Sequence, residues 1–307
     1  MENTNKKLYT NPWFVTIAAL ICCALWGSAT PFIKLGYELI LPHKGVPSTI
    51  LFAGIRFTLA GILTVLFYSI GRKQFLFPKK ENLHLVAKIS CFQTMIQYFF
   101  FYVGLANTTG VKGTVISGGN VFFAILISSL IFKQESLTLK KIVACIFGFA
   151  GIIVVNLNGL DLNMNFYGDC FVLFSAISYA TSSVLMKRYS KYEDPVILSG
   201  YQFILGGSVM IVVGLLLGGY IRIHNMAGLG VLIYLAFLSA IAYALWGILL
   251  QHNPVSKVTV FSFMTPVFGV ILSNIMLEEN GNVPLINLFI TLILVCTGII
   301  ILNYKKD

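Results

Sequence analysis

The sequence predicts an all-α integral membrane protein with ten transmembrane helices. Of its 307 residues, 57% are hydrophobic and 10% are charged, whereas a soluble domain carries about 25% Asp, Glu, Lys and Arg. Apolar runs recur from one end of the chain to the other, and each has the roughly 20 residues that a helix needs to cross the hydrocarbon core. These runs are continuously apolar, so they exclude both a water-facing globule and the alternating strands of an outer-membrane barrel.

Polar interruptions divide the chain into ten expected helices. The first follows Lys6 and Lys7 and lacks a convincing small-residue cleavage site, so we expect a retained helix rather than a secretory signal. The six cysteines lie within or at the ends of the runs with no metal-like or disulfide spacing, so we expect neither a metal nor a cofactor. The expected ranges are 12–36, 46–70, 83–106, 112–132, 137–156, 167–189, 194–219, 226–250, 256–277 and 283–303.

The basic residues indicate how these helices are oriented. With ten spans, 15 of the 21 Lys and Arg residues fall on the side of the N-terminus, and only Lys44, Lys112 and Arg222 fall on the other. Cytoplasmic loops carry the excess of positive charge, so we expect both termini in the cytoplasm and the chain in the cell membrane. Because the charges are spread between spans rather than gathered in one patch, the net charge of +10 does not indicate a nucleic-acid partner.

The second half of the chain resembles the first. Four pairs of segments match in order at offsets of 145 to 147 residues: Gly54–Gly61 with Gly200–Gly207, Ile96–Tyr98 with Ile241–Tyr243, Lys112–Ser117 with Lys257–Ser262, and Gly151–Asn156 with Gly298–Asn303. The matches predict two five-helix repeats, residues 1–158 and 159–307. Since five is odd, the second repeat must enter the membrane from the opposite side, which predicts inverted repeats with a binding site where they meet.

Several short motifs resemble those of the drug/metabolite transporter superfamily, and specifically of its EamA-like members. They are Leu25–Ser28, Arg56 with Phe57, Phe132–Glu135 followed by Leu137, Ala242–Trp246, Pro266–Phe268 and Leu277–Glu279. The resemblance covers essentially the whole chain and implies a carrier of small metabolites, such as amino acids, that moves them outward. Relatives commonly carry a proline early in the fourth and ninth helices. Here Pro266 fits, but its counterpart region carries Gly118 and Gly119, so these three residues are the candidate helix breaks.

Polar and aromatic residues within the spans are the candidates for a substrate cavity, because polar side chains at membrane depth face the bundle interior or water. They are Trp26, Ser28, Thr30, Arg56, Gln93, Gln97, Tyr98, Asn120, Tyr179, Ser183, Tyr243, Trp246 and Thr265. Aromatic faces with a few hydrogen-bonding groups are typical of ligand pockets. Two alternatives stay open: hydroxyls that bond back to their own helix, and aromatic rings that only pack or lie in an interfacial belt.

Arg56 is the one cation well inside a span among these candidates. It could attract a substrate carboxylate or phosphate, or be a structural arginine satisfied by backbone carbonyls. Its equivalent in the second repeat is the neutral Gln202, which slightly favours the structural interpretation. All eleven acidic residues map to loops or helix ends, which disfavours a proton-coupled exporter of cationic drugs and favours neutral, zwitterionic or anionic metabolites.

Other functional classes fit the sequence less well. The histidines, His43, His84, His224 and His252, lie near loops, and the spans hold no catalytic pair, so we do not expect an enzyme. A channel would need a ring of charges or carbonyls. A receptor or a structural membrane protein remains the alternative to the expected function, which is a secondary transporter of a small molecule that alternates between two inverted repeats.

Overall fold

The computed structural model of the chain describes residues 7–42, 45–157, 163, 165–223, 225–276 and 284–304, and every regular element in these ranges is helical. Nine segments of the described chain are long and apolar enough to cross a membrane. The one predicted span missing from these nine is the fifth, which corresponds to α8, Leu139–Val155. Its 17 residues reach about 25 Å. The prediction of an all-α membrane protein with about ten spans is confirmed. The predicted boundary between the repeats, at residues 158 and 159, lies outside the described residues.

Most spans follow their predicted ranges to within a few residues. Continuous helices form where the apolar runs hold no strong breaker: α3 Val46–Arg72, α8, α10 Pro195–Leu216, α11 Met226–His252 and α14 Leu285–Asn303. The first span, α2 Pro12–Ile40, is four residues longer than expected and carries Pro31 inside it. Lys34, which the predicted range 12–36 placed near the end of the first span, therefore lies inside the helix.

The other four spans are composite. The third contains η1 Lys80–Asn82, α4 Leu83–Ser90, the π-helix η2 Cys91–Ile96 and α5 Gln97–Ala106, and the sixth joins the π-helix η5 Phe166–Cys170 to α9 Phe171–Tyr189. The fourth contains α6 Gly110–Gly118, α7 Asn120–Leu126 and η3 Ile127–Ile131, and the ninth contains α12 Val255–Thr259, η6 Val260–Phe263 and α13 Met264–Met276. Such local departures from α-helical hydrogen bonding are frequent at functional sites.

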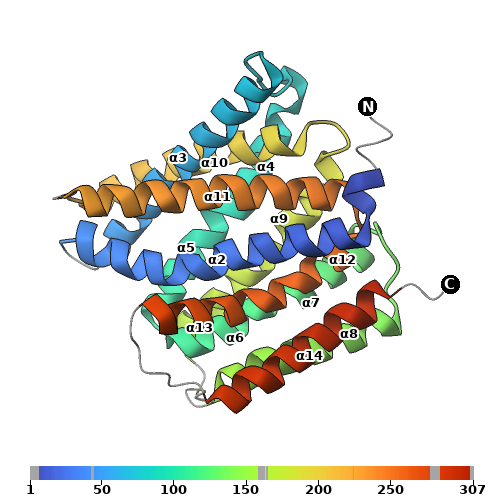
Figure 1. Cartoon of the computed structure of the whole chain (residues 1–307). Helices are drawn as coiled ribbons and strands as arrows, with labels where there is room; N and C mark the ends of the chain where they lie inside the picture. Colours follow the sequence, from blue (N-terminus) through green and yellow to red (C-terminus); the bar gives the residue numbers. More distant parts are fainter. Residues whose placement is uncertain are drawn as a thin grey trace.

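Hydrogen bonds between connections define the two ends of the bundle. At one end Asn253 binds the carbonyl oxygen of Tyr9 at 2.9 Å, and the backbone N–H of Lys79 binds Glu193 at 2.9 Å. At the other end the backbone N–H of Arg222 binds the carbonyl oxygen of Ile40 at 2.9 Å. Figure 1 shows α2 beginning and α14 ending at the same end, the right of the view. We call this the terminal end and the other the opposite end.

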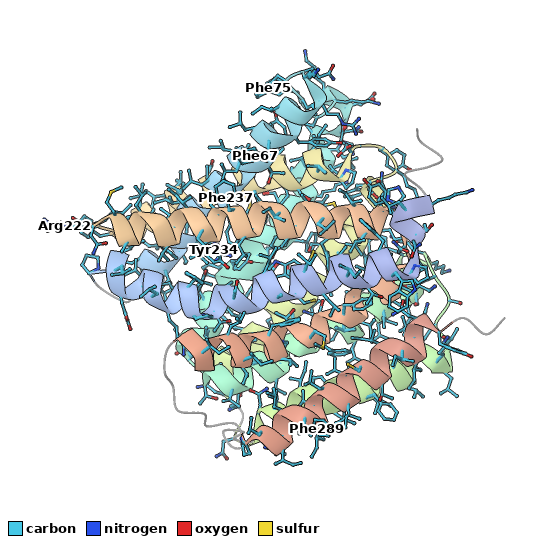
Figure 2. All side chains as sticks on the ribbon, in the orientation of Figure 1. Phe67, Phe75, Arg222, Tyr234, Phe237 and Phe289 are labelled. Atoms are coloured by element: carbon cyan, nitrogen blue, oxygen red, sulfur yellow. The ribbon has the colours of Figure 1, made fainter. Side chains whose placement is uncertain are left out.

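The outer surface of the bundle is apolar. Phe67, Phe237 and Phe289, on α3, α11 and α14, are exposed, whereas Figure 2 shows Arg222 at the opposite end, at the left of the view. Phe67 is 51% exposed and its ring centroid lies 5.6 Å from that of Phe237. Exposed aromatic side chains along helix flanks are expected where the surrounding solvent is lipid.

Glycines bring α3 and α10 into close contact. A Cβ added at Gly61 would lie 2.5 Å from the carbonyl oxygen of Gly200, and one added at Gly207 would lie 2.8 Å from that of Gly54. Small residues allow this approach, which replaces the hydrophobic driving force that lipid cannot supply. The N-terminal glycine of α3 faces the C-terminal glycine of α10, so the helices are antiparallel.

Candidate functional site

Seven aromatic side chains from six spans meet in the middle of the bundle. Trp26 on α2 is central: its ring centroid lies 4.9 Å from that of Trp246, 5.2 Å from that of Tyr243 and 6.4 Å from that of Tyr179. We call the group the central aromatic cluster. It consists of Trp26, Phe57, Tyr98, Tyr179, Phe203, Tyr243 and Trp246.

Two contacts in this cluster join residues that match between the predicted repeats. The hydroxyls of Tyr98 and Tyr243 are hydrogen-bonded at 3.0 Å. The rings of Phe57 and Phe203 stack with centroids 5.1 Å apart and planes 7° from parallel. Phe57 also lies 4.4 Å from Tyr98, and Phe203 lies 4.8 Å from Tyr243. The four rings therefore form one contact group in which α3 and α5 meet α10 and α11.

Arg56 lies beside this group and is 4% exposed. Its guanidinium carbon is 4.5 Å from the Phe57 ring centroid, and Nη2 donates to the Ser239 hydroxyl at 3.3 Å. Nε and Nη1 are buried and have no hydrogen-bond partner in the described chain, where no carboxylate lies within ion-pair distance either. Four tyrosines interact electrostatically with the guanidinium: Tyr37, Tyr98, Tyr102 and Tyr243.

Several other predicted site residues also carry buried polar atoms without partners. These atoms are the indole nitrogens of Trp26 and Trp246, the side-chain carbonyl oxygens of Gln93 and Gln97, and the hydroxyl of Thr265. Most buried polar groups in proteins are hydrogen-bonded, and each exception needs an explanation. An ordinary protein core has few such atoms. Their presence in several of the predicted site residues fits a site in which a ligand or water supplies the missing partners.

The remaining predicted residues are less closely associated with the cluster. Thr30 is exposed. Ser183 donates to the carbonyl oxygen of Tyr179 at 3.2 Å, one turn earlier in its own helix. Ser28 bonds both the carbonyl oxygen of Leu25 and the Tyr234 hydroxyl, each at 2.8 Å. For these two serines the structure gives hydroxyls satisfied by the protein itself.

Asn120 and the candidate helix breaks lie in the composite spans. Asn120 is half-buried at the first turn of α7, and no described contact joins it to the central aromatic cluster. The fourth span is interrupted at Gly119, between α6 and α7, directly after Gly118. Pro266 lies in the first turn of α13, directly after the η6 turn. Whether these positions act as hinges stays a prediction.

The sequence-based list of site residues omitted Phe57 and Phe203. Both are fully buried: Phe57 contacts Arg56 and Tyr98, and Phe203 contacts Tyr243. Phenylalanine in a membrane span carries no signal of function by itself. The signal that could have identified them was the repeat, because both stand at matching positions of the Gly54–Gly61 and Gly200–Gly207 segments.

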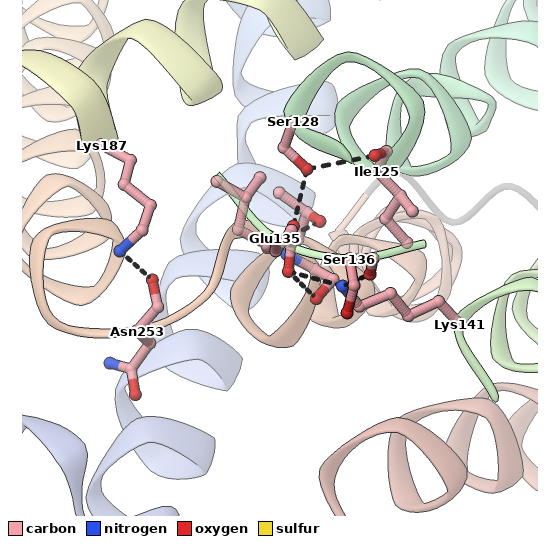
Figure 3. Close-up of polar contacts among 10 residues, drawn as sticks. Ile125, Ser128, Glu135, Ser136, Lys141, Lys187 and Asn253 are labelled. Atoms are coloured by element: carbon pink, nitrogen blue, oxygen red, sulfur yellow. Dashed lines mark hydrogen bonds and ion pairs between the residues drawn. The ribbon is translucent and has the colours of Figure 1, made fainter. Parts of the chain in front are cut away.

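A polar network holds the terminal end of the bundle together (Figure 3). Glu135, in the connection before α8, accepts hydrogen bonds from the Ser128 hydroxyl at 2.6 Å and from the Ser256 hydroxyl and backbone N–H at 2.6 and 3.0 Å. Lys141 pairs with the same carboxylate at 2.9 Å. Burial opposes ionisation of Glu135, but these donors outweigh it and hold its pKa below the ordinary value. The carboxylate thus binds the start of α12 to the fourth span.

Lys187 fastens the neighbouring helix end. Its Nζ donates to the backbone carbonyl oxygen of Asn253 at 2.6 Å (Figure 3). It also donates to that of Leu250 at 3.0 Å, where α11 ends. A cation at the C-terminus of a helix satisfies carbonyls that have no partner within the helix and interacts favourably with its dipole. Together with Glu135, Lys187 closes the bundle around the C-terminus of α11 and the N-terminus of α12.

A separate ion pair lies at the opposite end. Lys112, at the start of α6, pairs with Asp169 of η5 at 3.0 Å, and both side chains are almost fully buried. Thr108 donates to the same carboxylate. Each end of the bundle therefore has a buried carboxylate, paired with a lysine, that joins separate spans.

The comparisons with known proteins agree with a transporter bundle. The family described as "EamA-like transporter family" matches residues 13–157 and again residues 166–304. The chain belongs to the EamA-like transporter family and is a multi-pass membrane protein. The resemblance inferred from the short motifs is thereby confirmed.

Curated relatives cover most of the chain at low identity. It is 26% identical to "Uncharacterized transporter YvbV" of Bacillus subtilis, over 92% of this chain and 89% of that protein. It is 24% identical to a "Probable amino-acid metabolite efflux pump" of Escherichia coli, over 86% of this chain and 87% of that protein. A crystal structure with 16% identity superposes with a TM-score of 0.74 and covers 94% of this chain and 96% of that one, which shows that the fold is shared.

Proposed function

We propose that this protein is a secondary transporter that exports a small metabolite by alternating access between two inverted repeats, residues 1–158 and 159–307. The central aromatic cluster is the proposed substrate site. The relative in Escherichia coli named as an amino-acid metabolite efflux pump supports a metabolite of that size as cargo. In this proposal the protein lies in the cell membrane with both termini in the cytoplasm, as the bias of Lys and Arg toward the terminal end indicates.

The observation that carries the proposal is the contact between matching residues of the two halves. When two halves are related by a two-fold axis, only residues on the axis touch their own equivalents. Tyr98 touches Tyr243 and Phe57 touches Phe203, which supports an axis through the central aromatic cluster. Because α3 and α10 are antiparallel across it, the axis would lie in the membrane plane, as in carriers with inverted repeats.

The last helix of each half supports the same symmetry. A Cβ added at Gly298 on α14 would lie 2.6 Å from the carbonyl oxygen of Ala144, and one added at Gly151 on α8 would lie 2.7 Å from a methyl group of Val295. Gly151 and Gly298 are themselves matching positions of the repeat. A matching glycine of each helix thus packs closely against the other helix, as expected for two equivalent elements.

The ion-paired carboxylates at the two ends are the proposed gates. Glu135 with Lys141 would hold the cytoplasmic end, and Asp169 with Lys112 the external end. Alternating access requires that one end loosens while the other stays closed. Each network joins separate spans through a few directional bonds, so it can be broken without unfolding a helix.

Uptake by proteoliposomes tests the proposal. Radiolabelled amino acids, nucleosides and sugar phosphates are screened with the wild type and with the double variant Tyr98→Ala/Tyr243→Ala, which removes the contact on the proposed axis. We expect saturable uptake of at least one compound by the wild type and weaker affinity in the double variant. Tyr167→Ala, at a position 65% exposed, is the matched control and should transport normally.

Two results would count against the proposal. Unchanged kinetics in the double variant would remove the two tyrosines from the site. If no compound moved, while one of them triggered binding of a partner protein, the chain would be a receptor.

A further inference from the structure

The cation in the centre of the bundle has no anionic partner. Arg56 is 4% exposed, its Nε and Nη1 atoms lack hydrogen-bond partners, and its one hydrogen bond, to Ser239, is long at 3.3 Å. Among the described residues the ion pairs involve Lys112 and Lys141, not Arg56. A structural arginine in a membrane span is expected to be saturated by carbonyls or acids, and Arg56 is not.

The contacts that Arg56 does make compensate its charge only in part. The Phe57 ring at 4.5 Å provides a cation–π contact, which is weaker than a paired carboxylate. The hydroxyls of Tyr98 and Tyr243 bind each other at 3.0 Å rather than the guanidinium. Nη2 uses one of its two N–H groups for Ser239 and keeps the other, so an anion entering here can bind this second N–H together with the free N–H of Nε or of Nη1. Either pair forms an edge of the planar guanidinium that matches the two oxygens of a carboxylate.

The charge of the surroundings limits the anion to a single negative charge. Two charged residues of α2, Lys34 and Glu38, are exposed. The central aromatic cluster beside Arg56 consists of neutral rings. A phosphate dianion would leave one charge without a partner at membrane depth, at a high cost in free energy. One buried arginine matches one carboxylate.

The rest of the cluster indicates the remainder of the ligand. Trp26, Tyr243 and Trp246 supply aromatic faces, and the indole nitrogens of Trp26 and Trp246 are buried donors without acceptors. Flat apolar groups pack on such faces, and an ammonium group can lie over them without a carboxylate.

From this geometry we infer that Arg56 is the anchor for the carboxylate of the substrate, and that the site takes a monocarboxylate with a flat apolar body, either an organic acid or an amino acid. The inference rests on the proposed function, because it assigns the substrate class of the same site. The neutral amide of Gln202, matching Arg56 in the other repeat, then makes the site asymmetric, so that the carboxylate binds toward α3.

Ligand-dependent thermal stability of the purified protein tests the inference. Four probes share a phenyl ring and differ in charge: phenylpropionate, phenylalanine, phenethylamine and phenylpropanol. We expect phenylpropionate, phenylalanine or both to raise the Tm of the wild type, and phenethylamine and phenylpropanol not to do so. Which of the two carboxylates acts distinguishes an organic acid from an amino acid.

Arg56→Gln introduces the residue found at the matching position and should weaken carboxylate binding by about 10- to 100-fold. Arg72→Gln makes the same change at an exposed arginine and should leave binding unchanged. Arg56→Lys keeps the charge but loses the planar pair of donors, so it should bind with intermediate affinity, and it serves if Arg56→Gln is poorly folded. Without ligand, Arg56→Gln should be at least as stable as the wild type, whereas a structural arginine predicts a lower Tm.

The inference is overturned if no carboxylate stabilises the wild type, if phenylpropanol does so equally, or if binding survives in Arg56→Gln. Transport measured in parallel separates the two proposals. Carboxylate binding without any transport would refute the transporter but keep the site. Equal transport of a carboxylate by the wild type and Arg56→Gln would refute the anchor but keep the transporter.

Discussion

Gly61→Ala should destabilise the protein by forcing α3 away from α10. The new Cβ would lie 2.5 Å from the carbonyl oxygen of Gly200 and 2.7 Å from the backbone nitrogen of Ile204, whereas ordinary contacts begin at 3.4 Å. Both obstacles are backbone atoms, so the helices must separate by roughly 0.9 Å, which is the difference between 3.4 and 2.5 Å.

The magnitude follows from two opposing effects. Overpacking of a close contact costs about 1–3 kcal/mol, while replacing a helical glycine by alanine gains about 1 kcal/mol. Overpacking should win, because the opposing backbone atoms of α10 cannot move aside as the end of a flexible side chain could. Gly71→Ala is the control on the same helix: its Cβ would have nothing within 4 Å, so only the gain remains and its Tm should stay the same or rise.

Thermal unfolding monitored with a thiol-reactive fluorescent dye measures the effect, because Cys22, Cys23 and Cys145 are buried until the bundle opens. We expect a clearly lower Tm for Gly61→Ala than for Gly71→Ala. Gly207→Ala, whose Cβ would lie 2.6 Å from the backbone nitrogen of Thr58, should behave like Gly61→Ala. A Tm for Gly61→Ala equal to that of Gly71→Ala would refute the close packing of the two helices.

Three further predictions concern the gate, the axis and the topology. Because hydrogen bonds hold the pKa of Glu135 below its ordinary value, its carboxylate stabilises the folded protein at neutral pH and this stabilisation is lost as the pH falls through the lowered pKa; Glu135→Gln should flatten this acid-side decline in Tm, and an unaltered profile would contradict the role of the network. Tyr243→Phe removes the hydroxyl bonded to Tyr98 and should cost about 0.5–1.5 kcal/mol, measured by unfolding; a Tm equal to that of the wild type would mean that the pair contributes nothing. Cysteines introduced at the exposed positions Gln74 and Tyr220 should be labelled by an impermeant reagent from opposite sides of the membrane, with the parent protein as control, and labelling of both from one side would rule out the ten-span topology.

Hydropathy predicted most of the fold because lipid imposes two simple demands on a chain. Each span must be apolar over its length, and its backbone must bond within itself, so the range expected at 46–70 is found as Val46–Arg72. The interruptions were harder to predict. The π-helix at Cys91–Ile96 contains neither Gly nor Pro, so the sequence gives no local sign that the hydrogen-bonding pattern changes there.

The site residues were predictable to the extent that the repeat pointed to them. Tyr98 and Tyr243 stood at matching positions, and the structure places them in contact. Hydropathy places a residue within a span but does not give its accessibility, so it did not show that Thr30, one turn after Trp26 on the same face of α2, is exposed. The unpaired state of Arg56 could not be predicted, since it depends on which acids the fold keeps away from it.

Counterflow in proteoliposomes is the most direct test of a carrier that alternates between two repeats. Vesicles are loaded with unlabelled substrate, and uptake of trace labelled substrate is followed after dilution. A site exposed to one side at a time predicts that internal substrate accelerates labelled uptake, with a transient accumulation above the external level. Uptake that neither saturates nor responds to internal substrate, for every compound that moves, would indicate a channel and contradict alternating access.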